Sequence, residues 1–134
     1  MAAAWRAALP AGASDTPLDR SRRQLSGAPL LLLACLDLAD AREWPDERRR
    51  AAERDMFVQA LGAALQNLLL AAHALGLAGY LKGAPLFCRD AVREALDLPD
   101  TWQPAFLVLL GYPAPDLDPP PRQEPDPRSF LTRR

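Results

Sequence analysis

The stretch DERRRAAERDMFVQALGAALQNLLLAAHALG, residues 46–76, decides the fold that we expect for this chain. It follows Pro45 and opens on two acidic residues, which favour the positive end of a helix dipole. It closes on Gly76, a residue type that commonly ends helices in a left-handed conformation. The sequence therefore predicts one continuous helix over residues 46–76, which at about 1.5 Å per residue would be roughly 45 Å long.

The two parts of this helix differ in composition. The first part is mixed in charge, with Asp46/Arg50 and Arg49/Glu53 four residues apart, as ion pairs on a solvated helix face are. From Met56 onward, apolar residues occur on every side of the helix. A helix that is apolar all round is buried on several sides. We therefore expect the chain to be built around this helix, with only its beginning in water.

Composition and charge limit the function classes. A chain of 134 residues with 49% apolar content forms one ordinary domain with enough material for a core. Its net charge of -1 gives no electrostatic reason to expect a nucleic acid or an anionic membrane as partner. No targeting signal stands out, and the apolar residues 61–75 fall short of the roughly 20 residues of a membrane span. We expect a soluble, cytoplasmic protein with neither kind of partner.

Cysteine and histidine content predicts no special chemistry. Cys35 and Cys88 lie in apolar surroundings without disulfide or metal-ligand spacing, so we expect buried free thiols in a reducing compartment. His73, the only histidine, lies on the half of the long helix that we expect to be buried, which predicts a hydrogen-bonded core histidine. No Ser/His/Asp arrangement and no phosphate-binding glycine loop occurs. The sequence thus predicts no catalytic side chain and no metal ligand.

Further elements are expected on both sides of the long helix. Two continuous apolar runs, residues 28–38 (APLLLLACLDL) and 104–112 (PAFLVLLGY), are typical of buried strands. So few strands cannot cover both sides of such a helix, which suggests that a partner subunit or the beginning of the domain is missing. The remaining expectations are helices at residues 2–9, 17–25 and 88–96, and a short strand or extended crossing at residues 77–81.

The composition changes at Pro113. Seven of the fourteen prolines lie in the last 22 residues, so this segment should be extended. It ends in Ser129-Phe130-Leu131-Thr132, a short strand-like patch. An extended segment with an apolar end often docks on a second subunit.

Two segments carry a resemblance to a known family. QNLLLAAHALGL (residues 66–77) and FCRDAVREALDLPDTWQPAFLVLLGYP (residues 87–113) resemble the C-terminal part of the nitroreductase fold. The pieces WPDERRRAAERDMF, LFC, VREALDLP, Trp102-Gln103-Pro104 and GYP make the chain most similar to the flavin-binding C-terminal domain of the bifunctional coenzyme F420:L-glutamate ligase. The resemblance extends over almost the whole chain.

This resemblance implies an α+β fold of the nitroreductase type, with a mixed sheet around a long central helix. Residues 1–112 would be a partial nitroreductase-like domain, and residues 113–134 a Pro-rich arm that docks on a partner subunit. The assembly would be a homodimer, or a dimer with a homologous subunit, with FMN at the interface. The implied activity is that of an FMN-dependent oxidoreductase with a nicotinamide or deazaflavin electron donor, which reduces a dehydro precursor in coenzyme F420 biosynthesis.

The resemblance also implies which residues bind the cofactor. In the family, the backbone after the central helix passes along the flavin ring, and here this segment is residues 79–84. Lys82, Gly83 and Ala84 are therefore the implied cofactor-binding residues, with an amide of Gly83 or Ala84 as partner of the flavin N5. The alternative is that Gly83 only turns the chain. A basic residue of the arm would bind the phosphate, which here is Arg122, and the alternative is a solvated arginine.

One departure from the family pattern leaves a second hypothesis open. The family domain begins with an Arg-rich motif that binds the FMN phosphate, and nothing in this chain corresponds to it. We expect the N-terminal part of the domain to be absent and FMN to bind weakly, because charge-assisted contacts are the strong ones. The alternative function is a truncated, non-catalytic remnant that acts only as a dimerisation or interaction module.

Overall fold

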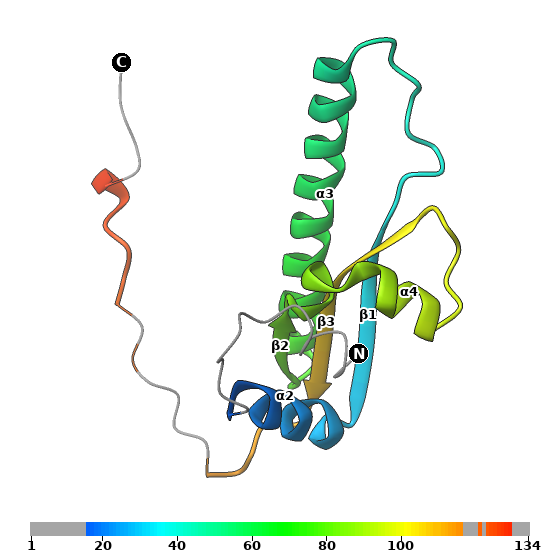
Figure 1. Cartoon of the computed structure of the whole chain (residues 1–134). Helices are drawn as coiled ribbons and strands as arrows, with labels where there is room; N and C mark the ends of the chain where they lie inside the picture. The colour runs from blue at the N-terminus through cyan, green and yellow to red at the C-terminus, as the bar shows by residue number, and fades with distance from the viewer. Residues whose placement is uncertain (1–15, 117–120, 122, 130–134) are drawn as a thin grey trace.

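The computed structural model describes residues 16–116, 121 and 123–129 of the chain. The predicted helices 17–25 and 88–96 and the predicted strands 28–38, 77–81 and 104–112 are confirmed in position to within a few residues, whereas the helix expected at residues 2–9 lies outside the described residues. The burial predicted for the strand at residues 28–38 is wrong for the single chain, because only Leu36 of its residues is buried and Leu30 and Leu31 are exposed. The elements, in chain order, are α2 (Thr16–Gly27), β1 (Leu30–Asp37), α3 (Glu47–Ala74), β2 (Ala78–Lys82), the 3-10 helix η1 (Ala84–Phe87), α4 (Arg89–Ala95), β3 (Trp102–Gly111) and the short 3-10 helix η2 (Pro127–Ser129) (Figure 1).

The sheet has the strand order β1-β3-β2, with β3 antiparallel to both neighbours. The described sheet is thus antiparallel, whereas the resemblance implied a mixed one, because both pairings of the described strands run in opposite directions. One irregularity interrupts the pairing of β1 with β3. Ala34 lies opposite Phe106 and Cys35 opposite Pro104, so Ala105 is an extra residue on β3.

The edge of β3 that faces β2 is only partly covered. The last pair between these strands joins Lys82 to Leu107, so residues 102–106 of β3 pair with β1 alone. Pro104 lies in this stretch, and its missing N–H suits an edge that carries no second neighbour. Among the described residues, the beginning of β3 therefore has no strand partner on the side of β2, where η1 packs against it instead.

The long helix begins and ends as the sequence predicts. Asp46 precedes it in an extended conformation, and its carboxylate accepts a hydrogen bond from the amide of Arg49 at 2.9 Å. At the other end Gly76 has a φ of 75°, which favours glycine. The amide of Leu77 bonds to the carbonyl of Ala72 at 2.9 Å, which closes the helix in a Schellman-type turn.

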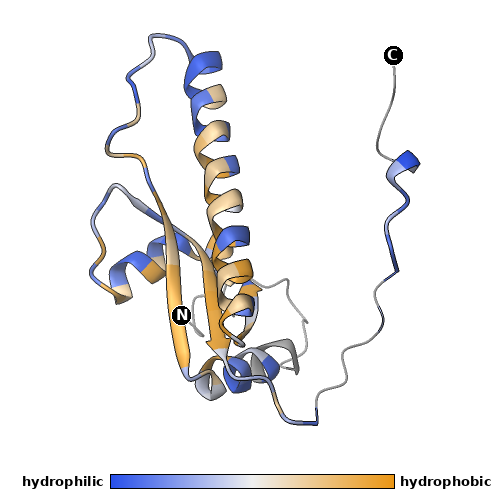
Figure 2. Ribbon diagram, turned by 180° about the vertical axis from the view of Figure 1, so that it is seen from behind, coloured by the Kyte–Doolittle hydropathy of each residue, from blue (hydrophilic) through white to orange (hydrophobic). Residues whose placement is uncertain are grey.

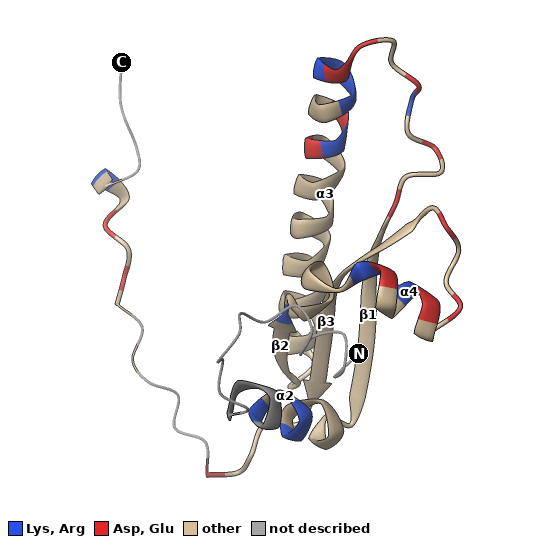
Figure 3. Cartoon of the chain, in the orientation of Figure 1, with Lys and Arg blue, Asp and Glu red and all other residues tan. Residues whose placement is uncertain are grey.

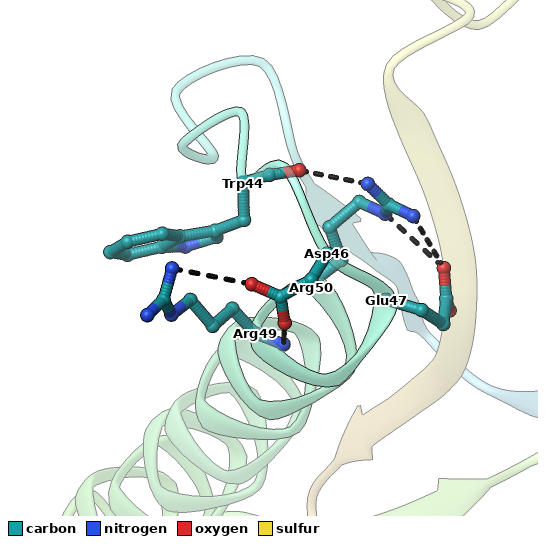
Figure 4. A network of polar contacts seen from close by, with 5 residues as sticks. All are labelled: Trp44, Asp46, Glu47, Arg49 and Arg50. Carbon is teal, nitrogen blue, oxygen red and sulfur yellow. Dashed lines mark hydrogen bonds and ion pairs between the residues drawn. The ribbon is translucent and has the colours of Figure 1, made fainter.

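The ion pairs at the beginning of α3 differ from those expected. Arg49 pairs with Asp46 at 3.3 Å and Arg50 with Glu47 at 2.9 Å, both three residues apart rather than four (Figure 4). The capping geometry is the reason, because it turns the Asp46 carboxylate toward Arg49. Glu53 is consequently not paired with Arg49. It accepts instead from the indole N–H of Trp44.

The core lies between α3 and one face of the sheet. Side chains from alternate positions of β3 meet those of α3, and the fully buried members of this cluster are Leu65, Ala72, Val108 and Leu110. The intervening β3 residues, Leu107 and Leu109, are buried on the other face. α4 lies against that face, opposite α3, and α2 lies at the foot of the sheet (Figures 1 and 2).

The all-round burial that we predicted for α3 is wrong for the single chain. Leu65 and Ala72 are its buried residues, whereas Met56, Leu70 and Leu75 are 68%, 57% and 76% exposed. The expectation that His73 is a core histidine is also wrong, since this side chain is exposed. The physical reason is that the described sheet covers only one side of the helix and leaves its remaining apolar surface uncovered.

α3 is the one described helix that is long and apolar enough to cross a membrane. Its most apolar 18-residue window has a mean hydropathy of 1.3 and is 11% buried. From residues 61–75 alone we expected a stretch too short to span a membrane. The apolar window is longer because it includes more of the helix than those residues. The core helix of a soluble domain meets the same criterion, and α3 uses the buried stripe of this window to cover a sheet.

Candidate functional site

Three of the four predicted cofactor-binding residues lie where β2 ends and η1 begins. Lys82 is the last residue of β2, Gly83 precedes η1 and Ala84 is its first residue. Pro85 follows at a position where a helical turn tolerates a missing N–H. The fourth predicted residue, Arg122, lies outside the described residues.

The amides of Gly83 and Ala84 are free of backbone partners. Within residues 16–116 and the described part of the arm, neither N–H donates a hydrogen bond to a carbonyl, as is usual for the first amides of a helical turn. Ala84 is only 6% exposed, and buried amides are normally paired. These two donors are therefore available to an acceptor on a bound group.

Glycine at position 83 is not required by the local conformation. Its φ of -80° suits most residues, and an added Cβ would lie in ordinary contact, 3.5 Å from Phe106 Cε1 and 3.6 Å from Leu86 Cδ1. The turn alone therefore does not explain this glycine. Gly79 differs, because a Cβ there would lie 2.5 Å from Leu69 Cδ2 on α3. Gly79 thus lies where β2 closely approaches the helix.

Lys82 is held in place by residues from two other positions. Its Nζ donates to Gln24 Oε1 of α2 at 2.7 Å and lies 5.9 Å from the centre of the Tyr80 ring. Burial, together with the positive charge of Arg20, lowers the pKa of Lys82. Both effects disfavour the cation, and an anionic group placed beside Lys82 would counteract them. The sequence did not reveal Gln24, which lies 58 residues away along the chain.

A shallow apolar hollow of about 190 Å³ adjoins this segment on one side. Ala78, Gly79 and Tyr80 of β2 line it together with Pro29 and Tyr112. Lys82, Gly83 and Ala84 are not among its lining residues, so the predicted cofactor-binding residues and this hollow are adjacent without coinciding. The segment 79–84 therefore offers apolar surface at its beginning and polar donors at its end.

Neither cysteine is paired. Cys35 and Cys88 are free thiols, as predicted, but both are half-buried rather than fully buried. Burial raises the pKa of Cys35, which keeps this thiol protonated and unreactive. The Sγ of Cys88 donates to the carbonyl of Ala84 at 3.5 Å and so supports η1. Among the described residues, no group of three or more His, Cys, Asp or Glu side chains could hold a metal ion.

Comparison with known proteins shows which family shares these features. The model of the nitroreductase family matches residues 3–112 of this chain. A predicted NADH dehydrogenase/NAD(P)H nitroreductase of Archaeoglobus fulgidus is 38% identical in an alignment of 68 positions that covers 48% of this chain and 38% of that protein.

Two solved structures extend the comparison to the fold. A predicted NADH dehydrogenase/NAD(P)H nitroreductase from Bacteroides thetaiotaomicron superposes with a TM-score of 0.59 at 24% identity, over 98% of this chain and 64% of that one. The FMN- and NADPH-dependent nitroreductase NfnB of a Sphingopyxis strain gives 0.53 at 19% identity, over 96% and 54%. The chain thus spans less than two thirds of the length of each of these relatives.

The matches agree with the geometry. The long helix packed on an antiparallel sheet, with η1 and α4 following β2, is the arrangement shared with the solved structures. The family model covers most of the chain and includes every described helix and strand up to the end of β3. This chain therefore belongs to the nitroreductase family.

Proposed function

We propose that the chain acts as an FMN-dependent oxidoreductase of the nitroreductase family. The observation that supports this proposal most directly is the pair of free amides at Gly83 and Ala84, next to the half-buried cation of Lys82. A flavin ring carries hydrogen-bond acceptors at N5 and O4 and needs donors of this kind. The related NfnB is described as FMN- and NADPH-dependent, which agrees with this proposal.

The described residues offer the donors and the positive charge that a flavin ring needs, and the phosphate is assigned to Arg122, which lies outside the described residues. The amide of Gly83 or Ala84 would donate to the ring, Lys82 would stabilise negative charge on it, and Arg122 of the arm would bind the phosphate. When bound, FMN supplies the ability to accept a hydride from one substrate and pass it to another. The chain's own contribution is to orient the ring with fixed backbone donors and to keep a positive charge close to it.

The proposal includes a second copy of the chain. The exposed apolar side of α3 is the surface that a partner would cover, and apolar patches of this kind mark interaction sites. We propose a homodimer, or a dimer with a homologous subunit, in which the arm at residues 113–134 docks on the partner. In line with a reducing compartment for the free thiols, the location would be the cytoplasm.

The substrate part of the proposal rests on the resemblance to the C-terminal domain of coenzyme F420:L-glutamate ligase. The physiological reaction would be reduction of a dehydro precursor in coenzyme F420 biosynthesis, with a nicotinamide or deazaflavin electron donor. Comparing reduction of such a precursor with reduction of a nitroaromatic compound would test it. Faster turnover of the nitroaromatic compound would count against the role in coenzyme biosynthesis.

A matched pair of variants tests the flavin site. Gly83→Pro removes the amide donor at a φ that proline can adopt, whereas Gly83→Ala keeps the donor and adds a Cβ in ordinary contact. The measurement is the quenching of flavin fluorescence when FMN is added to the full chain. We expect wild type and Gly83→Ala to bind FMN, and Gly83→Pro to bind it more weakly. Absence of binding by the wild type at excess FMN would refute the proposal.

A further inference from the structure

A polar hollow of about 370 Å³ lies where α3, α4 and the beginning of β3 meet. β2 ends opposite Leu107, and the hollow is lined by Trp102, Gln103 and Pro104 of β3, which have no partner in β2. Arg54 reaches it from α3, and Arg89 and Arg93 reach it from α4. Its volume falls in the range of roughly 300–1,000 Å³ that is usual for small-molecule sites.

The positive charges of this hollow are poorly compensated. Within the part of the chain that the structure describes, Arg54 and Arg89 form no ion pair. The Nη1 of Arg54 donates to a neutral oxygen, Gln103 Oε1, at 2.9 Å. Arg93 contacts Asp90 at 3.4 Å, but this carboxylate is 95% exposed, and such surface pairs are weak.

Arg89 adds a donor that lacks an acceptor. Its Nε is buried and has no hydrogen-bond partner among the described residues. A buried donor without a partner is costly, and a guanidinium nitrogen more so than a neutral one. The hollow therefore combines surplus positive charge with a lining residue that carries an unsatisfied hydrogen-bond donor, and an anion with several oxygens would compensate the charge.

The charge of the hollow suits a phosphoryl group. Three guanidinium groups and the carboxylate of Asp90 leave a formal charge of +2. A phosphate monoester carries about -1.5 to -2 at neutral pH and offers three oxygens, to which guanidinium groups can bond from several directions. A carboxylate offers one charge and two oxygens, and would leave one arginine without a partner.

We propose that this hollow binds the phosphoryl group of a small molecule. Arg89 Nε donates to one oxygen, and Arg54 and Arg93 hold the others from two sides. Trp102, which is 40% exposed, lines the same hollow and presents a flat apolar surface to the rest of the ligand. None of these residues belongs to the predicted flavin site at residues 82–84, so this proposal stands independently of flavin binding.

The direct test titrates the purified full chain with inorganic phosphate, adenosine 5′-monophosphate and adenosine at constant ionic strength, by isothermal titration calorimetry. We expect both phosphoryl compounds to bind and adenosine not to bind. Equal affinity for the two would show that the phosphoryl group alone is recognised. Tighter binding of the nucleotide that is lost in Trp102→Leu would identify a nucleotide as the ligand. Binding of adenosine alone, or of none of the three, would overturn the proposal.

Charge-matched variants locate the site. Arg89→Gln should lower the phosphate affinity by about tenfold or more, because it removes a charge-assisted donor. Arg48→Gln is the control, because Arg48 is an exposed arginine of α3 that does not line the hollow. The phosphate affinity of this variant should stay within about twofold of that of the wild type. If circular dichroism shows that Arg89→Gln does not fold, Arg54→Gln replaces it with the same expectation. Unchanged affinity in the folded variant, or an equal loss in Arg48→Gln, would overturn the proposal.

Discussion

The two ends of the molecule are held together by different forces. Where α3 begins, polar groups pair with one another: Asp46 caps the helix, Glu53 accepts from Trp44, and Arg54 donates to Gln103. Charged residues are concentrated at this end and on α4, and they occur also on α2, whereas the later turns of α3 and the adjoining ends of the strands carry almost none (Figure 3). At that second end, apolar contact is the main force.

The comparison shows which of the two ends finds its contacts within one chain. At the polar end, the side chains that cap and brace the helix find partners within the described part of the chain, some of them nearby in the sequence and one of them, Gln103, 49 residues from Arg54. At the apolar end, large side chains remain in water, and Leu70, Leu75, Tyr80 and Tyr112 are 57%, 76%, 53% and 84% exposed. Directional contacts can be satisfied locally, but apolar surface has to be covered by more surface. The apolar end is therefore the place where we expect a partner.

The most damaging change should be Leu65→Asp, in the buried stripe of the apolar end. Leu65 is 4% exposed and packs in the core cluster with Val108. An unpaired buried charge costs several kcal/mol, against a typical total stability of about 5–15 kcal/mol. We expect loss of the folded state, measured by circular dichroism and urea denaturation.

Leu70→Asp is the matched control for this change. Leu70 lies on the same helix but is 57% exposed, so the variant should keep the fold, with a change in stability within about 0.5 kcal/mol. If a second copy covers this side of α3, the variant should elute later in size-exclusion chromatography than the wild type. Equal unfolding of both variants would contradict the distinction between the buried and exposed sides of α3.

A smaller effect is expected where the helix approaches β2. Gly79→Val places a Cβ 2.5 Å from Leu69 Cδ2 and 3.1 Å from Leu110 Cδ2. Overpacking of this kind costs about 1–3 kcal/mol in the free energy of unfolding. Gly62→Ala should instead raise the free energy of unfolding by roughly 0.5–1 kcal/mol, because the added Cβ meets nothing within 4 Å and alanine favours the helix. Urea denaturation of both variants measures this contrast, and two changes of the same sign would refute it.

At the polar end, removal of the helix cap should cost less. Asp46→Ala removes the acceptor for the Arg49 amide and the ion pair with Arg49. Loss of such a cap costs about 0.5–2 kcal/mol. Asp46→Asn keeps a capping oxygen, and its stability should lie closer to that of the wild type in the same urea titration. A larger loss of stability in Asp46→Asn than in Asp46→Ala would show that Asp46 does not stabilise the protein through the helix cap.

Features encoded within one segment could be predicted from the sequence. The ends of α3 follow from Asp46 and Gly76, and β1 and β3 follow from two apolar runs, because each signal lies next to the element it controls. The pairing of Glu53 was missed because spacing along the helix favoured Arg49. The indole N–H of Trp44, in the preceding loop, is the partner that the fold brings into reach.

The candidate site was predictable only in part for the same reason. Lys82, Gly83 and Ala84 are consecutive, so a resemblance along the chain could identify them. The contact of Lys82 with Gln24 spans 58 residues, and that of Arg54 with Gln103 spans 49. Both depend on strand register and on the early end of β2, which no local pattern specifies. Arg54, which lines the polar hollow, lies in a run of charges that we interpreted as a solvated helix face, so the sequence did not reveal the hollow.

The smallest expected effect concerns Asp37, at the polar end of β1. Hydrogen bonds lower its pKa, first the one from the Ala39 amide and then those from Thr101 and the Trp102 indole. A carboxyl group whose pKa is lowered by folding stabilises the folded state above its unfolded pKa, and this contribution is lost as the pH falls through the folded value.

Asp37→Asn should therefore be less stable than wild type at neutral pH, with a difference that shrinks on acidification. Trp102→Phe, which lacks the N–H, should reduce this pH dependence without abolishing it, because the Ala39 bond remains. Thermal unfolding between neutral and acidic pH measures both variants. A difference that is constant with pH would show that the Asp37 contacts do not depend on its charge.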